Sequence, residues 1–168
     1  TEEDTKTLSD ARAQVADSLV AQAEWKDAVG YYDKIVRALQ GDTITRRSVL
    51  GDNLNQVWAR YRTGGVKLGI ASARAIHDRR RKSYGDDNYL TAEAQGFLAM
   101  GLLHNGQFSE ALNEFRAATN VLLTSSQDSA KDRSKVSARD LRLGAILDSY
   151  VELLGSAEGS KAATQVGF

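Results

Sequence analysis

The sequence contains no cysteine, no proline, a single methionine and two histidines, and it carries no excess of charge of either sign. Without cysteine, this segment can form no disulfide, no thiolate metal site and no cysteine nucleophile. The 22 basic side chains are balanced by 22 acidic ones, so the chain lacks the positive surface by which most nucleic-acid-binding and peripheral membrane proteins attract their ligands. We therefore expect neither nucleic acid nor a membrane among its partners.

Two further absences concern targeting. No apolar run approaches the roughly 18 residues that a membrane-spanning helix requires. The first four residues, Thr-Glu-Glu-Asp, include neither an initiator methionine nor the apolar core of a signal peptide. We therefore expect a soluble segment of a longer polypeptide. The sequence leaves its compartment unknown and favours the cytoplasm over the periplasm. Its 168 residues suffice for a single domain, over residues 1–168, that buries about 70% of its unfolded surface.

What the sequence does contain is apolar residues at helical spacing, most clearly between residues 95 and 122. The pattern predicts two amphipathic helices joined by a tight turn at Asn105-Gly106. Small residues near the middle of the two apolar faces, such as Ala99 and Ala111, allow the helices to approach closely. We therefore expect an antiparallel hairpin, which needs neighbouring elements to cover its remaining apolar surface.

The same spacing recurs along the chain. Ala28-x-x-x-Tyr32, Gly69-x-x-x-Ala73 and Ala111-x-x-x-Phe115 follow one another at intervals of about 41 residues, longer than the roughly 34 residues of a standard helical-hairpin repeat. We predict helices over about 9–23 and 25–39, then over 43–62 and 66–83, ahead of the hairpin just described. The repeats would cover about residues 9–41, 43–84 and 88–123, and an incomplete fourth repeat would cover 136–168.

The boundary of that fourth repeat is marked by composition. Residues 124–135 are almost wholly polar and predict a loop. Ser137 and Asp140 have the spacing of a capping box, which predicts that a helix starts there and runs to about Leu154. A further helix begins at about residue 160. Because the fourth repeat is incomplete, we expect some of its apolar surface to be exposed or to be covered by another copy.

This pattern resembles the tetratricopeptide repeat. The matching positions are Leu98, Ala99, Leu102, Gly106, Phe108, Ala111, Phe115 and Ala118, and the family's terminal proline is missing. The long period and residues 80–88 are similar to the kinesin-light-chain-like variety of the repeat. The resemblance implies an all-α fold: a right-handed superhelical solenoid of antiparallel helix hairpins with about seven or eight helices.

The resemblance also implies a function. In such solenoids, the first helices of successive hairpins line a concave face that binds extended or helical peptides. Mapped onto this sequence, the peptide-binding groove would contain Asp17, Asn55, Ala59, Arg62, Gly96, Met100 and Leu103. This set lacks the lysine and asparagine pairs with which chaperone-binding members hold a terminal carboxylate.

Residues 90–154 are in addition similar to the repeat region of bacterial CHAT proteins. Those proteins carry a caspase-like domain after their repeats, with histidine and cysteine as the catalytic pair. The resemblance implies that the present segment is a regulatory or sensor part of a larger protein, with a protease domain beyond it. No catalytic residue is carried over, because the segment has no cysteine.

The residues themselves offer little catalytic chemistry. His77 and His104 lie on different predicted hairpins, and Asp78 does not face His77, because adjacent residues of a helix point in different directions. No phosphate-binding loop and no His-Glu-x-x-His pattern occurs. We therefore expect no catalytic residue, no metal ligand and no cofactor in this segment.

One local basic cluster, at residues 77–82, has two interpretations. Its arginines could contact a phosphate or an acidic peptide. They could equally form a solvated helix end, where cations suit the negative end of the helix dipole. Asp86 and Asp87 lie just beyond the cluster and favour the second interpretation.

Two hypotheses for the function remain. The first is a protein- or peptide-binding scaffold, whose ligand could be a domain of the same polypeptide. The alternative is a structural module that self-assembles through its incomplete C-terminal end and has no separate ligand.

Overall fold

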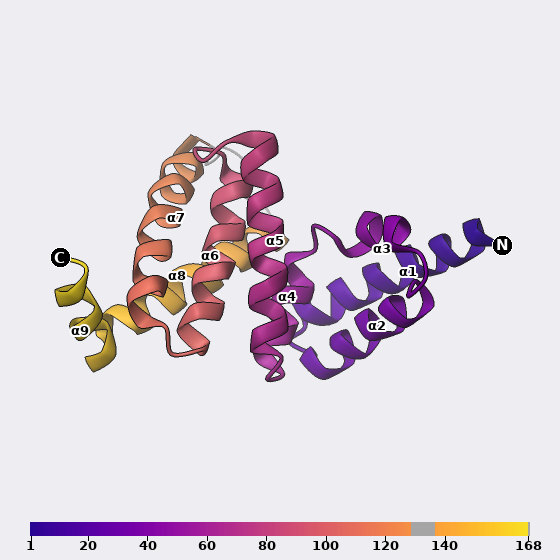
Figure 1. Cartoon of the computed structure of the whole chain (residues 1–168), viewed down its shortest axis with the longest axis horizontal. Coiled ribbons are helices and arrows are strands. Elements are labelled where there is room, and N and C mark those ends of the chain that lie inside the picture. Colours follow the sequence, from indigo (N-terminus) through magenta and orange to yellow (C-terminus); the bar gives the residue numbers. More distant parts are fainter. Residues whose placement is uncertain (129–136, 168) are drawn as a thin grey trace. The chain divides into compact units, whose positions relative to one another are not determined.

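The computed structural model describes residues 1–128 and 137–167, and within these ranges all regular structure is α-helical (Figure 1). The helices of the described residues are α1 (Glu2–Ala21), α2 (Trp25–Ala38), α3 (Thr43–Leu50), α4 (Leu54–Arg62), α5 (Val66–Tyr84), α6 (Tyr89–His104), α7 (Phe108–Asp128), α8 (Ala138–Gly155) and α9 (Ala157–Gln165). The all-α prediction is confirmed. The superhelical solenoid and the single domain stay predictions, and the chain divides into two compact units, residues 1–69 and 70–168.

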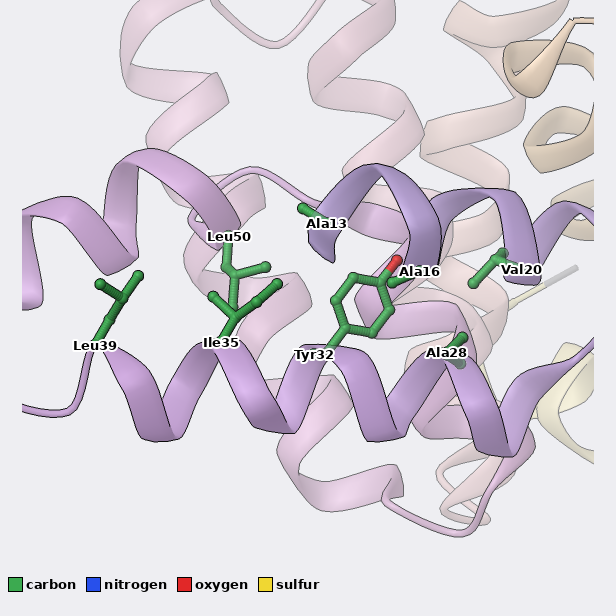
Figure 2. Packing of buried hydrophobic residues seen from close by; sticks show 9 residues of the cluster. Ala13, Ala16, Val20, Ala28, Tyr32, Ile35, Leu39 and Leu50 are labelled. Carbon is green, nitrogen blue, oxygen red and sulfur yellow. The ribbon is translucent and has the colours of Figure 1, made fainter. Parts of the chain in front are cut away.

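In the first unit, α1 and α2 pack as an antiparallel hairpin, and α3 and α4 pack against it. Figure 2 shows α2 directing one row of side chains, from Ala28 through Tyr32 to Leu39, toward α1 and the end of α3. Small residues of α1, Ala13 and Ala16, leave room for the fully buried Tyr32 ring. The core consists of Ala13, Ala16, Val20, Ala28, Tyr32, Ile35, Leu39, Leu50 and Ala59.

The helix expected over 43–62 is instead two helices, α3 and α4, separated by residues 51–53. The reason is local: the Asn53 side chain accepts a hydrogen bond from the Gln56 amide at 2.8 Å and so begins a new helix. Gly51 ends α3, and its amide donates to the carbonyl of Arg47 at 2.8 Å.

Three other boundaries differ from the prediction. The first helix begins at Glu2 rather than near residue 9, because Thr1 and Asp4 form a capping box. Residues 124–128 of the predicted loop belong to α7, and residues 129–135 lie outside the described residues. The last helix begins at Ala157 rather than 160, because the Ser156 side chain accepts from the Gly159 amide.

In the second unit, α6 and α7 form the predicted hairpin, and the left-handed conformation of Gly106 (φ 76°) closes its turn (Figure 1). α6 is buried almost all round, from Thr91 to Leu102. α8 packs against α6 and α7, and α9 packs against α7 and α8. The predicted capping box of Ser137 and Asp140 is confirmed at the start of α8. No helix in the described ranges has the length and apolarity needed to cross a membrane.

Candidate functional site

Two residues of the predicted groove, Asp17 and Asn55, meet in the first unit. The Asn55 side-chain amide donates to Asp17 Oδ1 at 3.1 Å, and the same oxygen accepts from the Tyr32 hydroxyl at 2.6 Å and from the Asn53 amide at 3.1 Å. Burial, together with the hydrogen bond to Asp17, holds the pKa of Tyr32 far above its usual value. Asp17 therefore ties α1 to α2 and to the start of α4.

Arg62 is the most exposed groove residue of the first unit, whereas Ala59 is fully buried in its core. The Arg62 guanidinium lies 5.5 Å from the centroid of the Trp25 ring, and that ring lies 5.1 Å from Trp58. Arginine and tryptophan recur in the energetically dominant contacts of protein interfaces. Arg62 is thus available to a partner, and Ala59 is not.

In the second unit, the predicted groove lies mostly under other side chains. A Cβ atom added at Gly96 would lie 2.7 Å from Cδ1 of Ile146, so α8 covers this position. Met100 is only 3% exposed, and Leu103 is half-buried. Of these three residues, only Leu103 has appreciable surface for a partner.

A buried ionic cluster, which the sequence analysis did not identify, joins α5, α6 and α8. The Glu93 side chain is 1% exposed; its carboxylate accepts from Arg142 Nε at 2.6 Å and from Arg80 Nη1 at 3.2 Å. Arg80 also donates to the carbonyl of Leu90 at 2.8 Å. The cluster therefore fixes α8 against α6 through charged hydrogen bonds.

This cluster changes the interpretation of the basic stretch at residues 77–82. Arg80 was expected at a solvated helix end, but it is buried, because its guanidinium neutralises Glu93. Arg81 does lie at the surface, where it pairs with Asp86 at 2.6 Å. His77 Nδ1 lies 3.5 Å from Asp78 Oδ1, so these neighbours do meet, contrary to expectation.

The side of α8 that faces away from α6 carries exposed apolar side chains beside two exposed acidic ones. We call it the outer face of α8 and define it by Leu141, Gly144, Leu147, Asp148, Val151, Glu152 and Leu154. Val151 is 68% exposed, Leu154 43% and Leu141 40%. Apart from the adjacent backbone of α8, a Cβ atom added at Gly144 would meet no atom within 4 Å. The opposite side of the helix is buried through Ile146 and Leu153. The sequence predicted exposed apolar surface within residues 136–168 but did not locate it.

Sites for small ligands are weaker candidates. Among the residues that the structure describes, no three histidine or acidic side chains group as metal ligands do. An open hollow of about 870 Å³ lies beside residues 38–45, and its lining includes Thr1, Thr5 and Thr45. A second open hollow, of about 450 Å³, lies between the start of α7 and α9. Neither is an enclosed cavity, so the outer face of α8 is the better candidate.

Comparison with known proteins gave no match to a family model, to a curated protein or to a solved structure.

Proposed function

We propose that this chain is a non-catalytic helical-repeat module that binds a protein or peptide, as a regulatory or sensor segment of a larger protein. The observation that carries the proposal is the outer face of α8. Folded proteins keep contiguous apolar patches at their surface small unless the patch serves an interaction. Covering exposed apolar side chains removes apolar surface from water, which favours association.

Buried and hydrogen-bonded side chains anchor α8 in the second unit. Ile146 and Leu153 anchor α8 in the second unit, Tyr150 stacks on Phe115 with 5.3 Å between ring centroids, and Arg142 is bonded to Glu93. A surface held in one conformation before binding loses little conformational entropy when the partner arrives. This arrangement suits recognition.

Self-assembly is the second candidate, because the same exposure of Val151 would be relieved by another copy. The two functions differ in what contacts α8. In the first case α8 contacts a foreign protein or another domain of the same polypeptide, and in the second the molecular mass rises with concentration.

The proposal is tested by photo-cross-linking in an extract of the source cells. A photoreactive amino acid placed at Val151 is expected to trap a defined foreign protein. The same amino acid at Leu123, which is 48% exposed on α7, serves as the control. Trapping of the chain by itself supports self-assembly instead. Trapping of the same proteins from both positions, or of none, contradicts the proposed function.

A further inference from the structure

We infer that the outer face of α8 docks one amphipathic helix with a basic flank, and that an apolar side chain of that helix sits on Gly144. This inference rests on the proposed function and specifies the partner. It follows from the register of α8, from the charges beside its apolar residues, and from what a second copy would present.

α6 and α8 carry glycines at comparable positions of their surfaces. α6 receives α8 at a glycine, Gly96, on which Ile146 lies, and seven residues later α6 carries Leu103 on the same side. α8 repeats this arrangement: Gly144 is followed seven residues later by Val151. Gly96 is covered, whereas the space beside Gly144 is empty. α8 therefore presents outward an uncovered glycine, comparable with the glycine at which α6 receives Ile146.

The spacing of the apolar residues on the outer face of α8 suits a helical partner rather than an extended strand. Gly144, Leu147, Val151 and Leu154 follow at alternating spacings of three and four residues, which makes a straight apolar stripe along α8. The missing side chain at Gly144 lets a partner backbone approach closely. A second helix laid along the stripe covers all four positions.

The charges beside the apolar stripe of α8 favour a basic partner. Asp148 and Glu152 are both exposed, one turn apart along one side of the stripe, and neither forms an ion pair within the described residues. The two arginines of α8 are engaged on other sides of the helix: Arg142 is bonded to Glu93, and the Arg139 guanidinium lies 3.5 Å from the centroid of the Tyr89 ring. Within α8, the charged side chains beside the stripe are therefore acidic, and a basic partner complements them.

The same charges argue against a second copy. In a two-fold antiparallel pair of α8 helices, the flank of one helix lies beside the identical flank of the other. Asp148 and Glu152 would then face their own equivalents, and like charges in contact oppose association. A foreign helix bearing lysine or arginine on that flank meets no such penalty.

The test uses two synthetic 18-residue helical peptides with the same isoleucine and leucine stripe, one flanked by lysine and the other by glutamate. Fluorescence anisotropy of the labelled peptides is measured against the whole chain at low and high salt. We expect the lysine peptide to bind at least tenfold more tightly than the glutamate peptide, and this preference to shrink with added salt. Replacement of both acidic side chains, by Asp148→Lys and Glu152→Lys, should make the chain bind the glutamate peptide more tightly than the lysine peptide.

The decisive variant is Gly144→Leu. The leucine side chain fills the empty space beside Gly144 without a clash in the folded chain, so it should reduce peptide binding at least tenfold. Because the change also removes a glycine from the middle of a helix, it should raise the melting temperature. The matched control is Gly30→Leu in α2, where a Cβ also has open space. That variant should leave binding unchanged.

Failure of the lysine peptide to bind overturns the inference, and so do three other outcomes. They are equal binding of the two peptides, undiminished binding by Gly144→Leu, and a wild-type dimer in light scattering that Gly144→Leu dissociates. If the lysine peptide fails while cross-linking from Val151 still traps a foreign protein, the inference falls and the proposed function stands. If both experiments fail, the proposed function falls as well.

Discussion

Glu93 places an ionisable side chain in the interior of the second unit, where an unpaired charge is very unfavourable. Two arginines neutralise it, and one of them, Arg80, is itself buried. A buried ion pair adds little net stability, yet removal of one partner leaves the other charge desolvated and uncompensated. The energetic importance of Glu93 is therefore visible only when the pair is broken.

We predict that Glu93→Ala lowers the free energy of unfolding by about 3–5 kcal/mol, because it strands Arg80 in the interior. The control is Asp86→Ala, which removes the partner of Arg81. That pair has an N–O distance of 2.6 Å, but both of its side chains are more than half exposed. Asp86→Ala should therefore lower the free energy of unfolding by less than about 1 kcal/mol. Urea denaturation followed by circular dichroism measures both changes, and similar losses in the two variants would contradict the prediction.

Single residues were the hardest part to predict from the sequence. Ala59, Gly96 and Met100 were assigned to a groove by their positions in the repeat, but the structure buries all three. A repeat motif fixes the helix and the register of a residue, but not which later segment packs on top of it. The signal for Glu93 was present: it is the only Asp, Glu, Lys or Arg in α6. Its arginine partners are distant in sequence and could not be paired with it in advance.

At the scale of the element, helix periodicity was a reliable guide. The hairpin of α6 and α7 was predicted because Ala111, Phe115 and Ala118 repeat at helical spacing, and all three are fully buried. The break between α3 and α4 was missed. Leu50, Leu54 and Val57 keep helical spacing across the break, so the apolar pattern did not indicate that a new helix begins here. The new helix begins because Asn53 caps it.

We expect Ala111→Leu to lower the free energy of unfolding by about 1–3 kcal/mol, because the added volume has no space between α6 and α7. Ala117→Leu makes the same change at an exposed position of α7 and should alter stability by less than about 0.5 kcal/mol. Thermal unfolding of the two variants side by side gives the comparison. A stability for Ala111→Leu equal to that of the wild type would show that the helices are not closely packed at this point.

At the scale of the whole molecule, the buried tyrosines make stability depend on alkaline pH. Burial raises the pKa of Tyr32, of Tyr61 and of Tyr89 above the usual value. In the unfolded chain, a tyrosine loses its proton near pH 10. Above that pH the unfolded state binds fewer protons than the folded state, so the free energy of unfolding falls as pH rises. Below about pH 10 the stabilisation is fully present.

We predict a steady loss of stability from about pH 10 upward, and we expect Tyr32→Phe to reduce that loss by about 1 kcal/mol at pH 11. The difference between urea unfolding at pH 8 and at pH 11 isolates this effect from the loss of the hydrogen bond to Asp17. Tyr84→Phe changes an exposed tyrosine and serves as the control. A pH profile for Tyr32→Phe identical to that of the wild type would mean that Tyr32 is not the source of the loss.

The partner of the molecule is the feature least accessible from sequence. The composition and the repeat pattern predicted a helical chain and favoured binding over catalysis. The surface through which we propose that it binds depends on which side of α8 remains uncovered, and Val151 and Ile146 are both apolar residues of the same helix. The packing of α8, including that of Ile146 on Gly96, determines that Ile146 is inside and Val151 outside.

Both tryptophans of the chain, Trp25 and Trp58, lie within residues 1–69. Their fluorescence emission therefore reports on the first unit alone, whereas far-ultraviolet ellipticity reports on helices in both. A substitution in the second unit, such as Glu93→Ala, can be followed with the two signals in one sample and without any label. The two signals each give the midpoint of an unfolding transition. The separation between these two midpoints then shows how strongly the folding of one unit depends on the other.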